Sequence, residues 1–305
     1  MSIRSKVVLD VENVSKVYGS RKVVNGVSFQ VCAGDIFAII GPNGAGKTTT
    51  IRMIMDIIKP DCGIVKILGY EFAEQTKKRV GYLPEERGLY KKLPVMDTIK
   101  YLASLKGLSS YESEKLAKPL LKRMGLYEHR FKKIEELSRG MGQFIQFAVT
   151  IIHNPDLIIL DEPFSGLDPV NAELLKEIIF DLRDQGRAIV LSTHQMTNVE
   201  ELCDRLLMIN TGEVVLYGNV QEIKKNYAIP AVFVRFSGSL ENINGVSEIK
   251  KEGDGISRLL LKTDANSKTV LNQIIQRPGE LTYFTEGHPR LQEIFIKVAG
   301  SKTRE

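Results

Sequence analysis

The sequence has few cysteines and no long apolar run. Its three cysteines, Cys32, Cys62 and Cys203, are odd in number and lack the spacing of metal ligands. This argues against a disulfide framework or a zinc site and is typical of a reducing compartment. No apolar stretch reaches the roughly 20 residues that a membrane-spanning helix needs, and the first residues lead directly into a strand pattern, so no signal peptide is expected. These absences predict a cytoplasmic protein.

Positive charge is only slightly in excess: the sequence has 42 Lys and Arg against 37 Asp and Glu, which gives a net charge of +5. The basic residues are not interleaved with aromatic ones, which argues against nucleic-acid binding. Pairs such as Lys91-Lys92 and Lys224-Lys225 are interpreted as solvated surface lysines, and a position near an anionic membrane surface stays open as an alternative.

What the sequence does contain is a phosphate-binding loop that fits G-x-x-x-x-G-K-[ST]. The apolar run 36–40 before it predicts a buried parallel strand, and the apolar spacing after it predicts a helix that Pro60 stops. In this setting backbone N–H groups wrap phosphate oxygens, Lys47 reaches the β- and γ-phosphates, and the Thr48 hydroxyl ligates Mg²⁺. The chain is therefore predicted to bind a nucleoside triphosphate through Gly41, Pro42, Asn43, Gly44, Ala45, Gly46, Lys47, Thr48 and Thr49.

Two further buried strands are predicted to carry polar residues to the same site. The strand 157–160 is fully apolar and ends in Asp161 and Glu162. An acid at that place is where a phosphate-loop protein holds Mg²⁺, although a paired structural carboxylate is the alternative. The strand 188–192 delivers His194 to its carboxyl end, where ligands bind in open α/β sheets. Tyr18, which closes the first strand, is either a strand-edge aromatic or a platform for adenine.

The pattern along the chain predicts an α/β fold in two domains. Residues 1–228 form a phosphate-loop NTPase core, RecA-like, with antiparallel strands near the N-terminus and a helical subdomain inserted at about 88–153. In that insertion Ile99, Leu102 and Leu105 are interpreted as core. Residues 229–305 form a small α+β domain with a ferredoxin-like β-α-β-β-α-β order. Its strands are expected at 231–236, 246–251, 257–262 and 281–285, its helices at 268–276 and 290–298, with a helical turn near 240–243 and a hairpin turn at Asp254-Gly255.

Over residues 7 to about 225 the chain resembles the ATP-binding subunits of ABC transporters. The resemblance is carried by Tyr18, the loop 41–49, Glu85, Leu137-Ser138-Arg139-Gly140-Met141, the strand ending in Asp161-Glu162, the turn 165–168 and His194. The stretch 85–90 and the C-terminal residues 289–295 look like one branch of that family, the exporters of the sodium-efflux and antibiotic-resistance type.

The resemblance implies an ATPase with a role for each of these residues. Tyr18 stacks on adenine, Lys47 and the loop hold the phosphates, and Thr48, Asp161 and Glu85 hold Mg²⁺. Glu162 is the general base and His194 contacts the γ-phosphate. Ser138 and Gly140 complete the site of a second subunit, with Asp168 at the seam of a head-to-tail homodimer. Separate integral membrane permease subunits would place the protein on the inner face of the cell membrane.

Two motifs depart from the family pattern. Glu85 stands where the family has Gln, and its carboxylate can still ligate Mg²⁺. Arg139 and Met141 replace the third and fifth residues of Leu-Ser-Gly-Gly-Gln, and Arg139 is expected to project into solvent rather than to contact a partner's γ-phosphate.

Three rival interpretations are weaker. A translation factor would carry two cassettes, a DNA-repair ATPase would carry a long coiled coil, and a non-hydrolysing regulatory subunit would not combine Glu162 with His194. For residues 229–305, bracing of a dimer is favoured over a regulatory small-molecule site.

Overall fold

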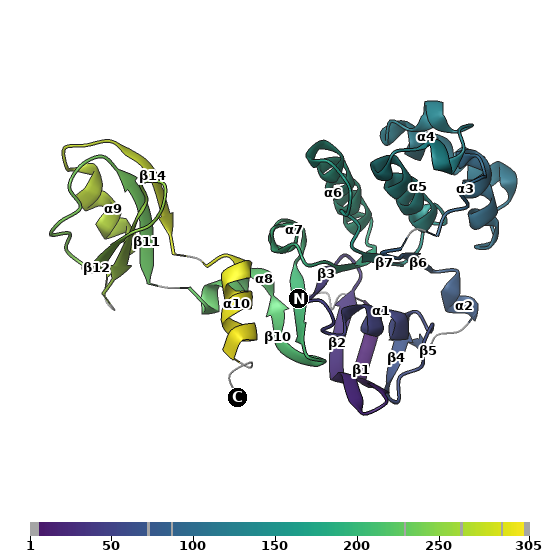
Figure 1. The fold of residues 1–305 in the computed structure, drawn as a ribbon, viewed down its shortest axis with the longest axis horizontal. Coiled ribbons are helices and arrows are strands. Elements are labelled where there is room, and N and C mark those ends of the chain that lie inside the picture. The colour runs from purple at the N-terminus through teal and green to yellow at the C-terminus, as the bar shows by residue number, and fades with distance from the viewer. Residues whose placement is uncertain are drawn as a thin grey trace. The chain divides into compact units, whose positions relative to one another are not determined.

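The computed structural model describes residues 6–71, 74–86, 88–228, 230–262, 265–287 and 289–301. The chain divides into two compact units, residues 1–220 and 221–305, which Figure 1 shows as ribbons. The domain boundary predicted between residues 228 and 229 stays a prediction, and Ile229 lies outside the described residues.

The first unit is built on a six-stranded sheet in the order β10-β9-β3-β8-β7-β6. Its strands are β3 (Ile36–Ile40), β6 (Val80–Leu83), β7 (Leu157–Asp161), β8 (Ala188–Ser192), β9 (Arg205–Asn210) and β10 (Glu213–Asn219). All neighbours pair in parallel except β10, which is antiparallel to β9 at the edge. Every residue of β3, β7 and β8 is buried, as expected of central parallel strands. The carboxyl ends of these strands therefore share one edge, where the predicted polar residues follow them.

Helices connect the parallel strands. They are α1 (Lys47–Ile54), α2 (Glu74–Lys77), α6 (Pro169–Asp184) and α7 (Met196–Leu202). The predicted helices after the phosphate loop and after Asp168 are present, the second with Pro169 at its first position and Asp168 as its N-cap. The sequence pattern does not predict α7, because its seven residues are too few for a helical period to be recognised.

A helical region stands between β6 and β7, as predicted for residues 88–153. It contains α3 (Val95–Ser104), α4 (Ser110–Arg123), α5 (Arg139–Ile151) and the single 3₁₀ turns η1 (Tyr127–His129) and η2 (Ile134–Glu136). Helix α4 begins with a capping box between Ser109 and Glu112. Ile99 is fully buried and Leu102 is half-buried, but Leu105 is 63% exposed, so its assignment to the core is wrong. It lies just after the last turn of α3, where the chain turns toward Gly107 and the helix no longer faces the core.

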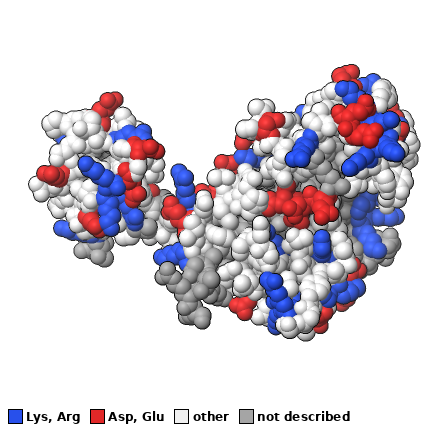
Figure 2. Space-filling view, viewed as in Figure 1, with Lys and Arg blue, Asp and Glu red and all other residues white. Residues whose placement is uncertain are grey.

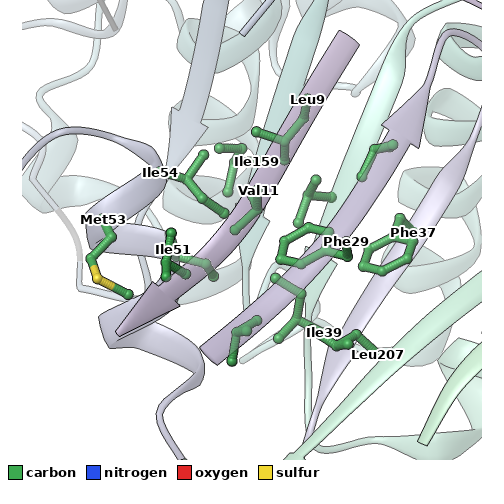
Figure 3. Close-up of a cluster of buried hydrophobic side chains, with 14 of the residues drawn as sticks. Leu9, Val11, Phe29, Phe37, Ile39, Ile51, Met53, Ile54, Ile159 and Leu207 are labelled. Carbon is green, nitrogen blue, oxygen red and sulfur yellow. The ribbon is translucent and has the colours of Figure 1, made fainter. Parts of the chain in front are cut away.

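A second, antiparallel sheet in the order β2-β1-β4-β5 lies near the N-terminus. It contains β1 (Val7–Tyr18), β2 (Arg21–Cys32), β4 (Cys62–Ile67) and β5 (Tyr70–Glu71). The antiparallel strands predicted near the N-terminus are confirmed, because β1 pairs antiparallel with β2. Figure 3 shows the core that it shares with α1 and the parallel sheet, in which the rings of Phe29 and Phe37 stack 5.0 Å apart. This core fixes α1 and the loop before it between the two sheets.

The second unit contains a four-stranded antiparallel sheet in the order β12-β13-β11-β14. Its elements are α8 (Val220–Asn226), β11 (Ala231–Phe236), β12 (Val246–Lys251), β13 (Ser257–Leu261), α9 (Ser267–Ile275), β14 (Leu281–Glu286) and α10 (Leu291–Ser301). The predicted hairpin turn is confirmed, with Asp254 and Gly255 both at positive φ.

The helical turn predicted near residues 240–243 is wrong, because that stretch forms turns and no helix. Two side chains of the α9 region hold it in this form: Arg277 donates to the carbonyl oxygens of Ser239, Glu241 and Asn242, and Gln273 bonds to both backbone groups of Asn244. The unit thus keeps the strand order of the split β-α-β-β-α-β fold without its first helix. A cavity of about 600 Å³ opens between this loop and the β12–β13 hairpin.

Candidate functional site

The phosphate loop joins β3 to α1, and its glycines are required by close backbone approaches. A Cβ on Gly41 would lie 2.1 Å from the carbonyl oxygen of Ile209, and one on Gly46 2.6 Å from that of Val23. Both residues have positive φ. At Gly44, also at positive φ, a Cβ would meet no described atom within 4 Å. Gly41 and Gly46 therefore let the loop pack closely against neighbouring backbone, while the space beside Gly44 is open to a ligand.

Lys47 is the first residue of α1 and points back into the loop. It is only 8% exposed, and its Nζ donates to the carbonyl oxygens of Gly41 at 2.8 Å and Pro42 at 3.1 Å. Burial lowers the pKa of Lys47, while the nearby carboxylates Glu162, Asp161 and Glu85 counteract that shift. A buried ammonium held by two neutral carbonyls is well placed to receive an anion, which phosphate oxygens would supply.

Most of the predicted site residues line one cavity of about 370 Å³. Three strand ends and the N-terminus of α1 meet there, so that the loop amides and the helix dipole favour a bound anion. Figure 2 shows acidic side chains gathered on this face over the region where β6 and β7 lie in Figure 1. The cavity is lined by Val23, Asn43, Gly44, Gly46, Lys47, Thr48, Thr49, Glu85, Asp161, Glu162, Ser192 and His194.

Asp161 ends β7 and is 2% exposed, with one carboxylate oxygen, Oδ2, buried and without a hydrogen-bond partner. Burial raises the pKa of Asp161, and the carboxylates of Glu85 and Glu162 add to this rise, whereas the Ser192 hydroxyl and Lys47 oppose it. A buried, unpaired carboxylate oxygen is costly unless a cation satisfies it. Within the described ranges no three His, Cys, Asp or Glu side chains converge on a metal position. The donor set thus fits a cation held jointly with nucleotide phosphates, as Mg²⁺ usually is.

Glu162 follows Asp161 with a φ of 50°, an unusual conformation for a residue other than glycine. Its backbone N–H donates to the Ser192 carbonyl at 2.9 Å, so β8 supports the turn. Its carboxylate is held by the next strand end: Oε1 accepts from the His194 N–H at 3.0 Å and lies 2.7 Å from His194 Nδ1, and Oε2 accepts from the Thr193 hydroxyl at 3.2 Å. Glu162 is therefore aimed into the cavity, while the His194 side chain stays 61% exposed.

The remaining predicted residues lie elsewhere. Gly41, Pro42 and Ala45 belong to the loop but do not line the cavity. Tyr18 ends β1 with 51% of its surface exposed and Lys16 Nζ 5.8 Å from its ring centroid. Ser138 caps α5 by accepting from the Met141 N–H, and Asp168 caps α6 by accepting from the Asn171 N–H. Ser138, Gly140 and Asp168 do not line the cavity of their own chain.

Comparison with known proteins identifies the family. The sequence pattern described as "ABC transporter" matches residues 24–165, and the one described as "ATP-binding protein DrrA1-3-like, C-terminal domain" matches residues 218–299. The chain is 38% identical over 296 residues to the ABC transporter ATP-binding protein YhaQ of Bacillus subtilis, in an alignment that covers 96% of this chain and 99% of that one. This chain is an ABC transporter ATP-binding protein.

Other ABC relatives match over nearly the full length. The linearmycin resistance ATP-binding protein LnrL of Bacillus subtilis is 30% identical over 318 residues, covering 97% of this chain and 100% of that one. The Nod factor export ATP-binding protein I of Burkholderia orbicola is 30% identical over 316 residues, covering 97% and 98%. A solved ATP-binding subunit of an ABC transporter aligns with a TM-score of 0.68 and 33% identity over 72% of this chain and 93% of that one. The predicted family, the phosphate-loop NTPase fold and the ATPase activity are thereby confirmed.

Some residues that shape the ABC site are not predicted from the sequence. Val23 and Ser192 line the cavity, and Thr193 holds Glu162. Val23 comes from β2, far from the phosphate loop in sequence, and no motif marks it. Ser192 and Thr193 directly precede His194 at the carboxyl end of β8, so their position at a strand end is the available signal.

Proposed function

We propose that this ABC ATP-binding protein acts as a dimer in which Ser138 and Gly140 of one subunit complete the ATP site of the other. The observation that carries the proposal is the position of these residues. They lie at the N-terminus of α5 and do not line the cavity of their own chain, although a helix N-terminus with a serine hydroxyl and a glycine suits phosphate oxygens.

Gly140 supports this proposal because its own chain does not require a glycine there. A Cβ at this position would lie 3.6 Å from the Gly166 carbonyl oxygen and from Leu167 Cδ2, which is ordinary contact, and its φ is not in the left-handed region. A glycine that the fold does not need is explained by a close approach of another molecule. The nucleotide of a second subunit is the ligand that the dimer would bring there.

Within one site, the residues would divide the work of hydrolysis. Lys47 and the amides of the phosphate loop bind and orient the phosphates, and Glu162 takes a proton from the attacking water as general base. His194 holds Glu162 through two contacts to Oε1, and its exposed ring would contact the γ-phosphate. Thr48, Asp161 and Glu85 would hold Mg²⁺, which neutralises phosphate charge when bound.

We further propose that hydrolysis drives transport, in the export direction, through separate membrane subunits. Among the described residues no helix is both long and apolar enough to cross a membrane. Relatives that match most of this chain are named for linearmycin resistance, Nod factor export and lantibiotic transport. The exposed ring of Tyr90, which packs edge-on against Tyr101, offers an aromatic contact surface beside the Glu85 loop for such a membrane subunit.

The dimer is tested by Gly140→Ala. Because a methyl group fits within the chain, ATP binding by the single subunit should not change and the melting temperature should not fall. The ATPase rate at saturating ATP should fall by about 10-fold or more, because the added methyl group keeps the partner's phosphates from approaching the backbone donors at the helix N-terminus. In the wild type the rate per subunit should rise with protein concentration. Gly253→Ala, at an open hairpin position with no atom within 4 Å, is the matched control. A fully active Gly140→Ala protein would contradict the proposal.

A further inference from the structure

Helix α5 carries a buried polar face that the phosphate-site motifs do not include. Gln143, Gln146 and Thr150 are spaced by three and four residues and so lie on one side of the helix. Each is at most 5% exposed, and the apolar residues Phe144, Ile145, Phe147 and Ala148 between them are buried as well. Polar side chains in such a place need hydrogen-bond partners, and their partners show what the face is for.

The two glutamines bond to the backbone beside site residues, whereas Thr150 contacts its own helix and strand β6. The Gln146 amide nitrogen donates to the carbonyl oxygens of Pro84 at 3.2 Å and Glu86 at 3.4 Å, one on each side of Glu85. The Thr150 hydroxyl lies 2.9 Å from the Gln146 carbonyl oxygen of its own helix and 3.3 Å from the Tyr82 carbonyl oxygen in β6. Gln143 donates to the carbonyl oxygen of Pro163, the residue after Glu162.

The Glu85 segment needs such support more than β6 does. Tyr82 pairs with Ile159 in the parallel sheet, but the sheet pairing of β6 ends at Leu83. Beyond that point Pro84 has no N–H to donate. The two bonds from the Gln146 amide reach the carbonyl of the peptide group before Glu85 and the carbonyl of Glu86, the next residue. They fix the backbone on either side of Glu85, and the course of this backbone decides where the Glu85 carboxylate stands in the cavity.

The cost of the arrangement shows that packing alone does not explain Gln146. Its amide oxygen is buried without a hydrogen-bond partner, which is unfavourable. An apolar side chain of the same length would fill the space without that cost. The two bonds of the Gln146 amide nitrogen account for a glutamine at this position.

We propose that Gln146 is a positioning residue for ATP hydrolysis, which holds the Glu85 carboxylate at the Mg²⁺–phosphate part of the cavity by bonding to the carbonyl oxygens of the residues before and after it. This inference rests on the proposed contact of Glu85 with Mg²⁺. It also means that α5, whose N-terminus carries Ser138 and Gly140, holds the Glu85 loop of its own chain.

The test is Gln146→Met in the full chain. Methionine keeps the length and packing of the side chain but removes the donor and the unsatisfied oxygen together. The melting temperature should stay equal or rise. The Mg²⁺ concentration for half-maximal ATPase rate should increase and kcat should fall, by about 3-fold to 30-fold in combination, as expected for a small misplacement of a site group.

Two controls accompany this variant. ATP binding measured in EDTA should be unchanged by Gln146→Met, because the inference concerns the metal-dependent step. Thr150→Val, which removes a bond from the same helix face to the sheet-held Tyr82, is the matched substitution and should hydrolyse ATP like the wild type.

A double-mutant cycle separates this inference from the proposed role of Glu85. If Gln146 acts through Glu85, Gln146→Met should have no further effect on the Mg²⁺ curve of Glu85→Ala. A wild-type curve for Gln146→Met beside a shifted one for Glu85→Ala would overturn the positioning role alone. A wild-type curve for Glu85→Ala would overturn the contact of Glu85 with Mg²⁺, and the inference with it. Effects that add in full, or a Gln146→Met protein with a lower melting temperature and an unaltered Mg²⁺ requirement, would assign Gln146 to packing.

Discussion

Replacing Glu162 with glutamine removes the proposed general base with little change in shape. The carboxylate is 12% exposed and is held at three points, by the backbone N–H and Nδ1 of His194 and by the Thr193 hydroxyl. The amide oxygen of glutamine can accept the two His194 contacts at Oε1. Its NH₂ group can donate to the Thr193 hydroxyl, which serves as either donor or acceptor. The substituted side chain is therefore expected to keep its place in the cavity.

The magnitudes follow from these contacts. Hydrogen bonds to a charged group exceed those to a neutral one by about 1 kcal/mol. Part of that loss is offset, because Glu162 and Asp161 repel each other and Glu162 contributes to the raised pKa of Asp161. The free energy of unfolding should thus change by less than about 2 kcal/mol. The hydrolysis rate should fall at least ~100-fold, because an amide cannot take a proton from water.

The assay combines single-turnover hydrolysis with size-exclusion chromatography in ATP and Mg²⁺. The Glu162→Gln protein should bind ATP, retain it uncleaved and elute as a stable dimer, while the wild type returns to monomer as ATP is consumed. Glu177→Gln, at an exposed position on α6 outside the cavity, is the control for a change from Glu to Gln. A Glu162→Gln protein that stays monomeric with full turnover would refute the assignment of the base.

Two other substitutions test neighbouring parts of the proposal. Glu85→Gln should largely preserve the ATPase rate, since an amide oxygen can also ligate Mg²⁺, whereas Glu85→Ala should raise the Mg²⁺ requirement. Identical Mg²⁺ titrations of the wild type and the two variants would mean that Glu85 does not touch the metal. Changing Leu89 and Tyr90 together to Asp should abolish co-purification with the membrane subunit and leave ATP affinity intact, because Tyr90 is 48% exposed beside the Glu85 loop. An unaltered complex, or an unfolded double mutant, would count against a contact with the membrane subunit at these residues.

The sequence is most informative where a local pattern determines a local structure. The apolar runs 36–40, 157–160 and 188–192 appear as the buried strands β3, β7 and β8, since full burial and short length leave little else for such runs. Parallel pairing then requires the residues after these strands to meet. The meeting of Lys47, Asp161 and His194 at one cavity is for this reason predictable from the order of strands and motifs along the chain.

Other features depend on contacts between distant segments, which a single sequence does not show. The predicted helical turn near residue 240 is wrong because Arg277 and Gln273, which come much later in the chain, bond to the carbonyls of that loop. The exposure of Leu105 likewise depends on where α3 ends against its neighbours rather than on helical spacing. The periodicity of a segment indicates which residues share a face, but the partner of that face is decided elsewhere in the chain.

The same distinction applies within the site. The motifs identify the carboxylates, yet neither Glu162 nor Glu85 is positioned by the motif that contains it. Glu162 stands at a φ of 50° and is held by Thr193 and His194 at the end of β8. Glu85 lies between two carbonyls that Gln146 of α5 bonds. The proposed γ-phosphate contact, His194, follows β8, and the proposed partner contact lies at the start of α5. We therefore expect a nucleotide that shifts either element to move a carboxylate as well. In the proposed dimer, the supports of the two acids are therefore where we expect ATP binding and dimer closure to control the rate of hydrolysis.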